Sequence, residues 1–441
     1  MNNERKNMRI FQQNWHPTTM AKRLWLHFLN DSQFRNSTYI ILATAVMSAF
    51  GFVFWIIASR LYTPAEIGLA TSLISVTSLL TTFSLFGLNN VIIRFLPTSS
   101  DRNRLISTAL VVTSLGSVLT GILFLLWAHV VHNPVIQLGA FSVVAPIFIA
   151  LIFLQTTGII LDSVFVAERN AKYILFKNSL FSIAKIALPF LFFALGSIGI
   201  IYSITIAALL AWLAGLFWVI IIINFKFIFF KIKALTGMRR FATGNYLGNL
   251  FGALPTSLLP LIIVSRLGAQ EAAYFYMPMM IITLINVIPS ANAQSLFAEA
   301  SNNEKELAAH LRKALRYLFL VLTPAVITVG IFGHLILGFF GPEYTETGTR
   351  VLQILAIASF IGSLNYFGDT VLNIKKFSGL YVGMNAFNAL TIVLLAYFAA
   401  PLGLVAIALA FLASQILTLL VYIVINRSLI KKMIAYQRTT S

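Results

Sequence analysis

The sequence predicts an all-α membrane protein with about 12 transmembrane helices in two six-helix lobes. Hydrophobic residues make up 59% of the 441 residues, charged residues only 10%, and the mean hydropathy is +0.88. Twelve apolar stretches are long enough to cross a hydrocarbon core of about 30 Å, which takes about 20 helical residues. Landmarks of the first half also recur in the second, which is typical of membrane folds built from repeated bundles.

The chain opens with a polar tail, residues 1–36, which carries six basic residues. It lacks the short apolar core and small-residue cleavage site of a signal peptide, so it is predicted to be a cytoplasmic N-terminal tail. Residues 20–29 alternate cations with leucine and aromatic side chains. They form either an amphipathic helix on the membrane surface or part of a loosely ordered tail.

Two groups of six spans follow. The first lobe, residues 37–224, has spans near 37–58, 67–93, 105–127, 138–161, 173–195 and 198–224. A linker, residues 225–240, mixes five basic residues with four phenylalanines and is expected to lie along the anionic inner leaflet. The second lobe, residues 241–426, has spans near 241–265, 272–298, 314–340, 349–372, 377–399 and 402–426, and a cytoplasmic tail of residues 427–441 ends the chain.

The basic residues set the expected orientation. On this map, 27 of the 31 Lys and Arg residues fall in the two tails, or in and next to the loops on their side. Since cytoplasmic loops carry an excess of Lys and Arg, both termini are predicted to be cytoplasmic and the protein to lie in the cytoplasmic (inner) membrane. The net charge of +18 then reflects topology and contact with anionic lipids, and no nucleic acid is expected as a partner. With no cysteine and six scattered histidines, neither a metal nor a cofactor is expected.

The turn after the first span has a counterpart after the seventh. Residues 59–68 end one span with an arginine and begin the next with a glutamate, and residues 265–271 do the same about 206 residues later. In the first turn Thr63 and Glu66 occupy the N-cap and N3 positions of a capping box, with Pro64 at N1. We therefore expect Glu66 to cap a helix rather than to take part in transport.

Two polar landmarks repeat as well. Asp162 and Asn178 return as Asp369 and Asn385, both 207 residues on. Because an even number of spans separates the repeats, the two lobes are expected to be related by a two-fold axis along the membrane normal.

Two motifs resemble those of the bacterial polysaccharide (O-antigen-type) flippases. They are RLYTPAEIG at residues 60–68 and GLNNVIIRF at residues 87–95, and the likeness covers about residues 35–426. These flippases share a superfamily with multidrug and toxin extruders and with lipid II flippases. The resemblance implies a multidrug-extruder-like fold of two lobes in a V that open alternately to the two sides. It further implies an isoprenoid-diphosphate-linked oligosaccharide as substrate, and a polysaccharide polymerase and other assembly proteins as partners.

The chain departs from two branches of that superfamily. Lipid II flippases typically carry two further spans, which this chain lacks. Drug extruders often carry a carboxylate inside the N-terminal lobe, whereas all 13 acidic residues here are expected in tails, loops or span ends.

Lys185 is the first candidate for substrate binding. It lies at the middle of the span 173–195, where an ionised amine costs at least about 2.5–3.5 kcal/mol. Asn178, Ser182 and Pro189 share its helix face, so this polar stripe is expected to face a water-filled cavity, where the ammonium would meet a diphosphate. The alternative is a lysine that only joins neighbouring helices.

Three further residues are candidates for the cavity: Arg94 at the cytoplasmic end of the second span, Asn249 in the seventh and Asn292 in the eighth. Amides suit sugar hydroxyls, although they also join helices. Arg60 and Arg266 are instead expected to snorkel or to pair with the glutamates of their turns.

Three classes of function fit the sequence. The leading hypothesis is a flippase of lipid-linked oligosaccharides, which does no covalent chemistry and is not an enzyme. A multidrug or toxin extruder of the same fold is the second. An integral-membrane glycosyltransferase is the third, and the outer loops offer it only four glutamates.

Overall fold

The computed structural model describes residues 32–440 except 131–140, 230–234, 236 and 303–306. Within these residues every regular element is a helix, and 12 helical stretches are long and apolar enough to cross a membrane. The predicted all-α fold with about 12 spans is therefore confirmed. Residues 20–29 and part of the basic linker lie outside the described residues.

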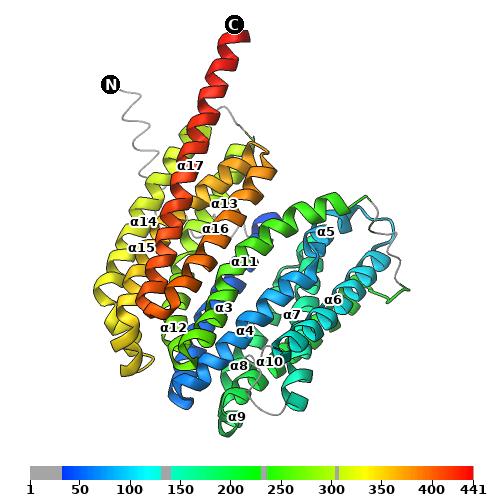
Figure 1. The fold of residues 1–441 in the computed structure, drawn as a ribbon. Helices are drawn as coiled ribbons and strands as arrows, with labels where there is room; N and C mark the ends of the chain where they lie inside the picture. Colours follow the sequence, from blue (N-terminus) through cyan, green and yellow to red (C-terminus); the bar gives the residue numbers. More distant parts are fainter. Residues whose placement is uncertain (1–31, 131–140, 230–234, 236, 303–306, 441) are drawn as a thin grey trace, which may run out of the picture.

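The first lobe is built from the helices up to the linker (Figure 1). They are α3 (Ser32–Leu61), α4 (Pro64–Leu85), α5 (Leu88–Phe95), α6 (Arg102–Val130), α7 (Phe141–Ala167), α8 (Lys172–Ala187), α9 (Pro189–Phe192) and α10 (Ser197–Ile223). The predicted second span is not one helix, because Phe86 and Gly87 both adopt left-handed backbone angles and separate α4 from α5. The fifth span is likewise interrupted before Pro189, whose ring cannot continue a regular helix.

The second lobe repeats this order. Its helices are α11 (Arg239–Leu267), α12 (Ala269–Ile285), α13 (Val287–Asn302), α14 (Leu307–Gly338), α15 (Pro342–Ile374), α16 (Ser378–Ala399) and α17 (Leu404–Thr440). Packing partners correspond between the lobes: α3 packs on α8 as α11 packs on α16, and α10 packs on α7 and α8 as α17 packs on α15 and α16.

The first repeated turn forms as predicted. The Thr63 hydroxyl accepts from the backbone N–H of Glu66, and the Glu66 carboxylate accepts from the backbone N–H of Thr63 at 2.8 Å, which completes the capping box of α4. Tyr62 lies outside the spans, and burial, with a smaller effect of Glu66, raises its pKa to about 12. Its hydroxyl therefore stays protonated and donates to the Pro189 carbonyl at 3.3 Å.

The second repeated turn has no side-chain cap. Gly268 is the N-cap of α12, with a φ of 101° that favours glycine. The described contacts of the two turn arginines are with groups other than the nearby glutamates, while the snorkelling alternative stays a prediction. Arg60 donates to the Phe339 carbonyl at 3.1 Å, and the Arg266 guanidinium lies 4.3 Å from the Tyr397 ring centroid.

Helix α11 connects the two lobes. Pro255 and Pro260 lie inside it, and Figure 1 shows its first turns leaning toward α5. Close to this start the Tyr246 hydroxyl donates to the Phe83 carbonyl of α4 at 3.2 Å. Farther along, Gly248 packs so closely on the Tyr381 ring of α16 that a methyl group there would lie 2.7 Å from a ring carbon. The same helix thus touches both lobes.

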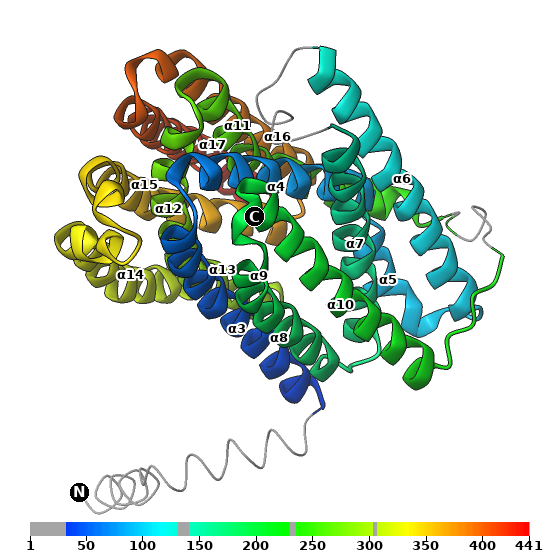
Figure 2. The same ribbon diagram turned by 90° about the horizontal axis from the view of Figure 1, so that it is seen from below.

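The lobes meet at the end seen from below in Figure 2, where α4 packs on α11 and α12. At the start of α4, a methyl group on Gly68 would overlap the carbonyl oxygen of Ala269 at the start of α12. Farther along the same interface the Ser72 hydroxyl donates to the Pro260 carbonyl at 3.3 Å. The two repeat-related turns therefore form the closed end of the molecule, while the ribbons diverge toward the other end (Figure 1).

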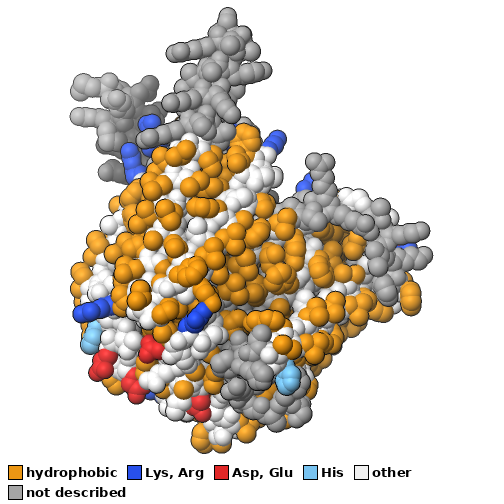
Figure 3. Space-filling model, in the orientation of Figure 1, with side chains coloured by type: hydrophobic (Ala, Val, Ile, Leu, Met, Phe, Trp, Pro, Cys, Tyr) orange, Lys and Arg blue, Asp and Glu red, His pale blue; other side chains and the backbone are white. Residues whose placement is uncertain are grey.

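Hydrophobic side chains cover the middle of the surface in Figure 3, and charged side chains gather toward its ends. Leucines and isoleucines on the outside of α14 are strongly exposed, including Leu320 at 73% and Ile331 at 67%. In water this surface would aggregate, whereas in a bilayer it contacts lipid.

Candidate functional site

A cavity begins between the lobes, next to the closed end. Residues of α3, α4, α11 and α12 line this inter-lobe part, which has a volume of about 380 Å³. Its hydroxyl side chains are Ser48, Ser75, Ser78, Thr256, Ser257 and Thr283. Trp55 and Tyr276 contribute a pair of rings with centroids 5.0 Å apart.

The cavity continues into the second lobe. Thr256, Met279 and Thr283 line both the inter-lobe part and a second part between α11, α12 and α15 to α17. Gly252, Tyr366, Asp369 and Asn385 in turn line both this second part and a third, of about 780 Å³, bordered by α11, α13, α15 and α16. These three adjoining parts are referred to below as the central cavity.

Amides dominate the polar lining of the central cavity in the second lobe. They are Asn249, Asn286, Gln294, Asn365, Asn373, Asn385, Asn388 and Gln415. Some are held by other helices: Ser359 donates to Asn286 at 2.5 Å, and Asn365 donates to the Gln415 side-chain oxygen at 2.9 Å. Among the described residues that line the central cavity, Asp369 is the only charged one.

Asp369 is held by two neighbouring helices. The Tyr422 hydroxyl of α17 donates to its carboxylate at 2.5 Å, and the Asn385 amide of α16 donates at 3.0 Å. Gly368 leaves room for this contact, because a methyl group there would lie 2.7 Å from the Tyr422 ring. Asp369 and Asn385 were recognised in the sequence as repeat landmarks but were not predicted to share a cavity.

The equivalent aspartate of the first lobe has a different partner. Helix α7 extends to Ala167, so Asp162 lies inside it and not just past the end of the expected span 138–161. Lys177 of α8, counted in the sequence among the loop cations, is buried and forms an ion pair with Asp162 at 2.7 Å. At the position equivalent to Lys177, 207 residues on, the second lobe has Met384. In the first lobe Lys177 thus neutralises Asp162, whereas in the second lobe the equivalent Asp369 lines the central cavity.

The structure separates the two predicted asparagines. Asn249 is exposed on α11 and lines the central cavity. Asn292 lies on another face, where its amide donates to the Ala314 carbonyl of α14 at 2.8 Å and joins two helices. Any role of either residue in substrate binding stays a prediction.

Lys185 lies over aromatic rings of the first lobe. Its ammonium is 4.5 Å from the ring centroid of Phe54, which is fully buried in α3, and 5.5 Å from that of Phe181. Ser182 is buried and Asn178 half-buried on the same helix. None of these residues is among those that line the central cavity in this conformation, so their contact with a substrate stays a prediction.

Arg94 is exposed in the last turn of α5. Its guanidinium lies 5.6 Å from the ring centroid of the adjacent Phe95. It does not line the central cavity, and its proposed role there is likewise untested.

Two lobes of membrane-spanning helices around a cavity that is closed at one end are the architecture of a multi-pass membrane transporter. Residues 34–297 match the family model described as "Polysaccharide biosynthesis protein", and the chain belongs to this family. The predicted membership is thereby confirmed. The chain is also similar to the "Putative O-antigen transporter" of Shigella flexneri, with 28% identity over 106 residues. That match spans 23% of this chain and about a quarter of the length of the relative.

Solved structures share the fold at low sequence identity. One is a lipid II flippase, MurJ, in an inward closed conformation, with a TM-score of 0.72, 14% identity and coverage of 89% of this chain and 87% of that one. Another is the inward-facing conformation of a multidrug resistance MATE family transporter of the MOP superfamily, with a TM-score of 0.69 and 15% identity. That comparison covers 91% of this chain and 99% of the other.

Proposed function

We propose that this protein translocates isoprenoid-diphosphate-linked oligosaccharide units across the cytoplasmic membrane for polysaccharide biosynthesis. The observation that carries the proposal is the lining of the central cavity, in which amides and hydroxyls are many and the only charge among the described lining residues is that of Asp369. Such groups donate and accept hydrogen bonds without demanding a charged ligand, which suits the hydroxyls of a sugar chain. Membership of a polysaccharide biosynthesis family supports the same substrate class.

The transport step is alternating access of the two lobes. In this conformation the contact of Gly68 with Ala269 closes one end, while the ribbons diverge toward the end at which α17 finishes (Figure 1). With both termini in the cytoplasm, as the Lys and Arg distribution predicts, the diverging end faces the cytoplasm and the protein is ready to load. Separation of α4 from α12 would then release the glycan outside.

The test is made in cells of the source organism from which this protein has been deleted. Lipid-linked glycan is expected to accumulate on the cytoplasmic side, and the wild-type protein should restore export. Gly252→Trp should not restore it, because Gly252 lines the cavity with open space beside it and an indole would fill that space. Leu320→Trp is the matched control, since Leu320 is 73% exposed on the outside of α14.

Two outcomes would contradict the proposal. The first is deletion without any accumulation of lipid-linked glycan. The second is a deletion that only sensitises the cells to cationic drugs, which would make the protein a multidrug extruder.

A further inference from the structure

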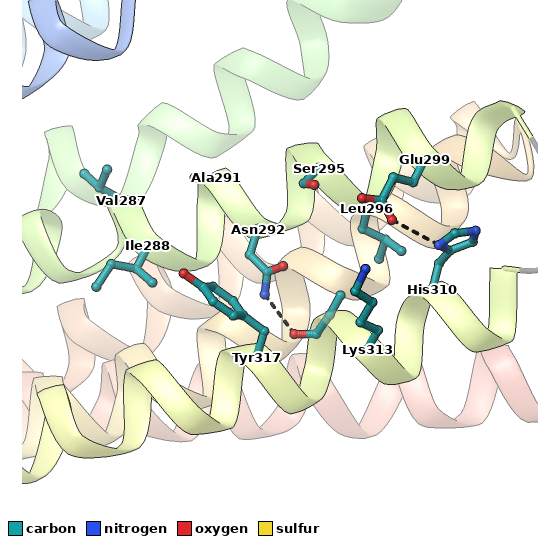
Figure 4. Close-up of a pocket in the computed structure, with 11 residues that line it drawn as sticks. Val287, Ile288, Ala291, Asn292, Ser295, Leu296, Glu299, His310, Lys313 and Tyr317 are labelled. Atoms are coloured by element: carbon teal, nitrogen blue, oxygen red, sulfur yellow. Dashed lines mark hydrogen bonds and ion pairs between the residues drawn. The ribbon is translucent and has the colours of Figure 1, made fainter. Parts of the chain in front are cut away.

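A second cavity lies on the other side of α13, between this helix and α14 (Figure 4). It is an open groove of about 610 Å³ that shares no lining residue with the central cavity. We refer to it as the α13–α14 groove. Of the residues predicted to bind substrate, Asn292 lines this groove, and the proposed function does not account for the groove.

Helix α13 separates the groove from the central cavity. Ser290, Gln294 and Phe297 line the cavity, whereas Ser295 and Glu299 line the groove. At 100° per residue these two sets fall on opposite sides of the helix. A ligand that reached around α13 would therefore touch the groove and the central cavity at once.

The groove changes character along its length. At one end Val287, Ile288 and Ala291 form an apolar lining, and at the other the Glu299 carboxylate pairs with the His310 ring at 3.0 Å. Lys313 projects into the groove near this polar end (Figure 4). From Val287 to Glu299 the helix rises roughly 18 Å, at about 1.5 Å per residue. The groove is thus amphipathic along the direction in which the helices cross the membrane.

From the length of α14, we infer that the polar end lies at the level of the lipid headgroups. Helix α14 has 32 residues, and Lys313 is in its second turn, about 9 Å from its first residue by helical rise. Val287 follows the break between α12 and α13, which lies inside a single membrane span. A lipid aligned with its neighbours in the bilayer would place its headgroup beside Lys313 and its chain against Ile288 and Ala291.

Positive charge gathers on the first turns of α14. Arg312 and Arg316 flank Lys313 on the same helix, against the single carboxylate of Glu299 in the groove. The central cavity, by contrast, has Asp369 and no Lys or Arg among its described lining residues. In this conformation the groove, and not the central cavity, offers the cation that a diphosphate needs.

From these observations we propose that the α13–α14 groove binds the isoprenyl diphosphate part of the lipid carrier. The diphosphate lies against Lys313, the isoprenyl chain follows the apolar lining, and the glycan passes around α13 into the central cavity. This inference rests on the proposed function and assigns the lipid and the sugar to opposite faces of one helix.

The test measures binding of a long-chain isoprenyl diphosphate without sugar to the full-length protein in nanodiscs of phosphatidylcholine. Lys313→Gln should weaken binding about tenfold, the loss expected for one charge-assisted contact of about 1.4 kcal/mol. The matched control is Arg312→Gln, which removes the same charge one residue away but outside the groove lining, and its affinity should stay within about threefold of wild type.

A second pair of variants tests the apolar end without changing charge. Ala291→Trp should weaken binding because the indole fills the groove, whereas Leu320→Trp, on the outer surface of α14, should not. Equal losses in the Lys313 and Arg312 variants would overturn the proposal, as would unchanged binding in Ala291→Trp. Displacement of the probe by an equal concentration of phosphatidylglycerol would also overturn it, since the groove would then be a general site for anionic lipids.

The experiments distinguish failure of the groove proposal from failure of the proposed flippase function. If the Lys313 and Ala291 variants are folded and export glycan at the wild-type rate, the groove proposal is wrong while the flippase function stands. If deletion causes no glycan accumulation, the proposed function fails, and the sugar-free binding measurement still decides whether the groove takes an isoprenyl diphosphate.

Discussion

The sharpest prediction concerns the closed end. Gly68→Ala should weaken the contact between the lobes, because the added methyl group would overlap the carbonyl oxygen of Ala269. The backbone nitrogen of Ala273 is also close, at 3.2 Å from the added carbon. Both obstacles are main-chain atoms of α12, so no side-chain rotation can relieve the overlap and the two helices must separate.

The size of the effect follows from the nature of that overlap. Inserting a methyl group into a closely packed contact costs about 1–3 kcal/mol. Since the overlap exists only while α4 and α12 are in contact, this cost falls on the closed state and not on the separated one. The equilibrium should therefore shift toward the separated state by about 5- to 150-fold.

Cysteine labelling measures this shift directly, because the wild-type chain contains no cysteine. Ser72 is fully buried at the interface between α4 and α11, so Ser72→Cys should react slowly with a membrane-impermeant maleimide added outside intact cells. Adding Gly68→Ala should raise the labelling rate at least about fivefold.

The control is Gly51→Ala, which adds the same methyl group to α3 where no atom lies within 4 Å. Labelling of Ser72→Cys should be unchanged in this background. Unchanged labelling with Gly68→Ala, or an equal increase with Gly51→Ala, would refute the assignment of the closed end.

Three further predictions concern polar side chains of the membrane spans. Lys177→Met should destabilise the protein by about 3–5 kcal/mol in chemical denaturation, since the half-buried carboxylate of Asp162 is left without its partner inside a span, and adding Asp162→Asn should recover most of the loss. Lys185→Ala should stop glycan export although the protein still folds, and Lys185→Arg should retain part of the export activity because the positive charge persists. Export at the wild-type rate by Lys185→Met would show that Lys185 does not bind the substrate through its charge. Asn249→Leu should lower glycan export and leave the melting temperature unchanged, because Asn249 lines the central cavity. Asn292→Leu should instead lower the melting temperature, because it removes a hydrogen bond worth about 1 kcal/mol. The reverse pattern would exchange the roles of the two residues.

The sequence predicted the secondary structure well because a bilayer imposes simple rules. Every backbone group inside the hydrocarbon must find an internal partner, so each long apolar stretch becomes a helix. The capping box of Thr63 and Glu66 was also predictable, since its atoms lie within one turn of chain. Its counterpart at Gly268 was not, because a glycine cap depends on a left-handed backbone angle and has no side-chain signature.

The partners of the polar residues were decided by tertiary structure. Asp162 and Asp369 occupy the same place in the two repeats, yet one pairs with a lysine and the other faces a cavity. The span expected from hydropathy ended at residue 161, just before Asp162, because hydropathy cannot detect that α7 continues past a carboxylate that a neighbouring helix neutralises.

The same limit applies to the candidate site. Sequence spacing put Lys185 and Ser182 on one helix face, and both residues lie in α8. Of the two predicted amides, Asn249 lines the central cavity and Asn292 does not. Which face meets the cavity, and which meets a ring such as Phe54, depends on how helices distant in the chain pack together. The sequence therefore determined what crosses the membrane and how often, because that depends on the length and polarity of each stretch alone. The position of the cavity was decided only by the packing of α11, α13 and α15, because a cavity is the space that several side chains together leave empty.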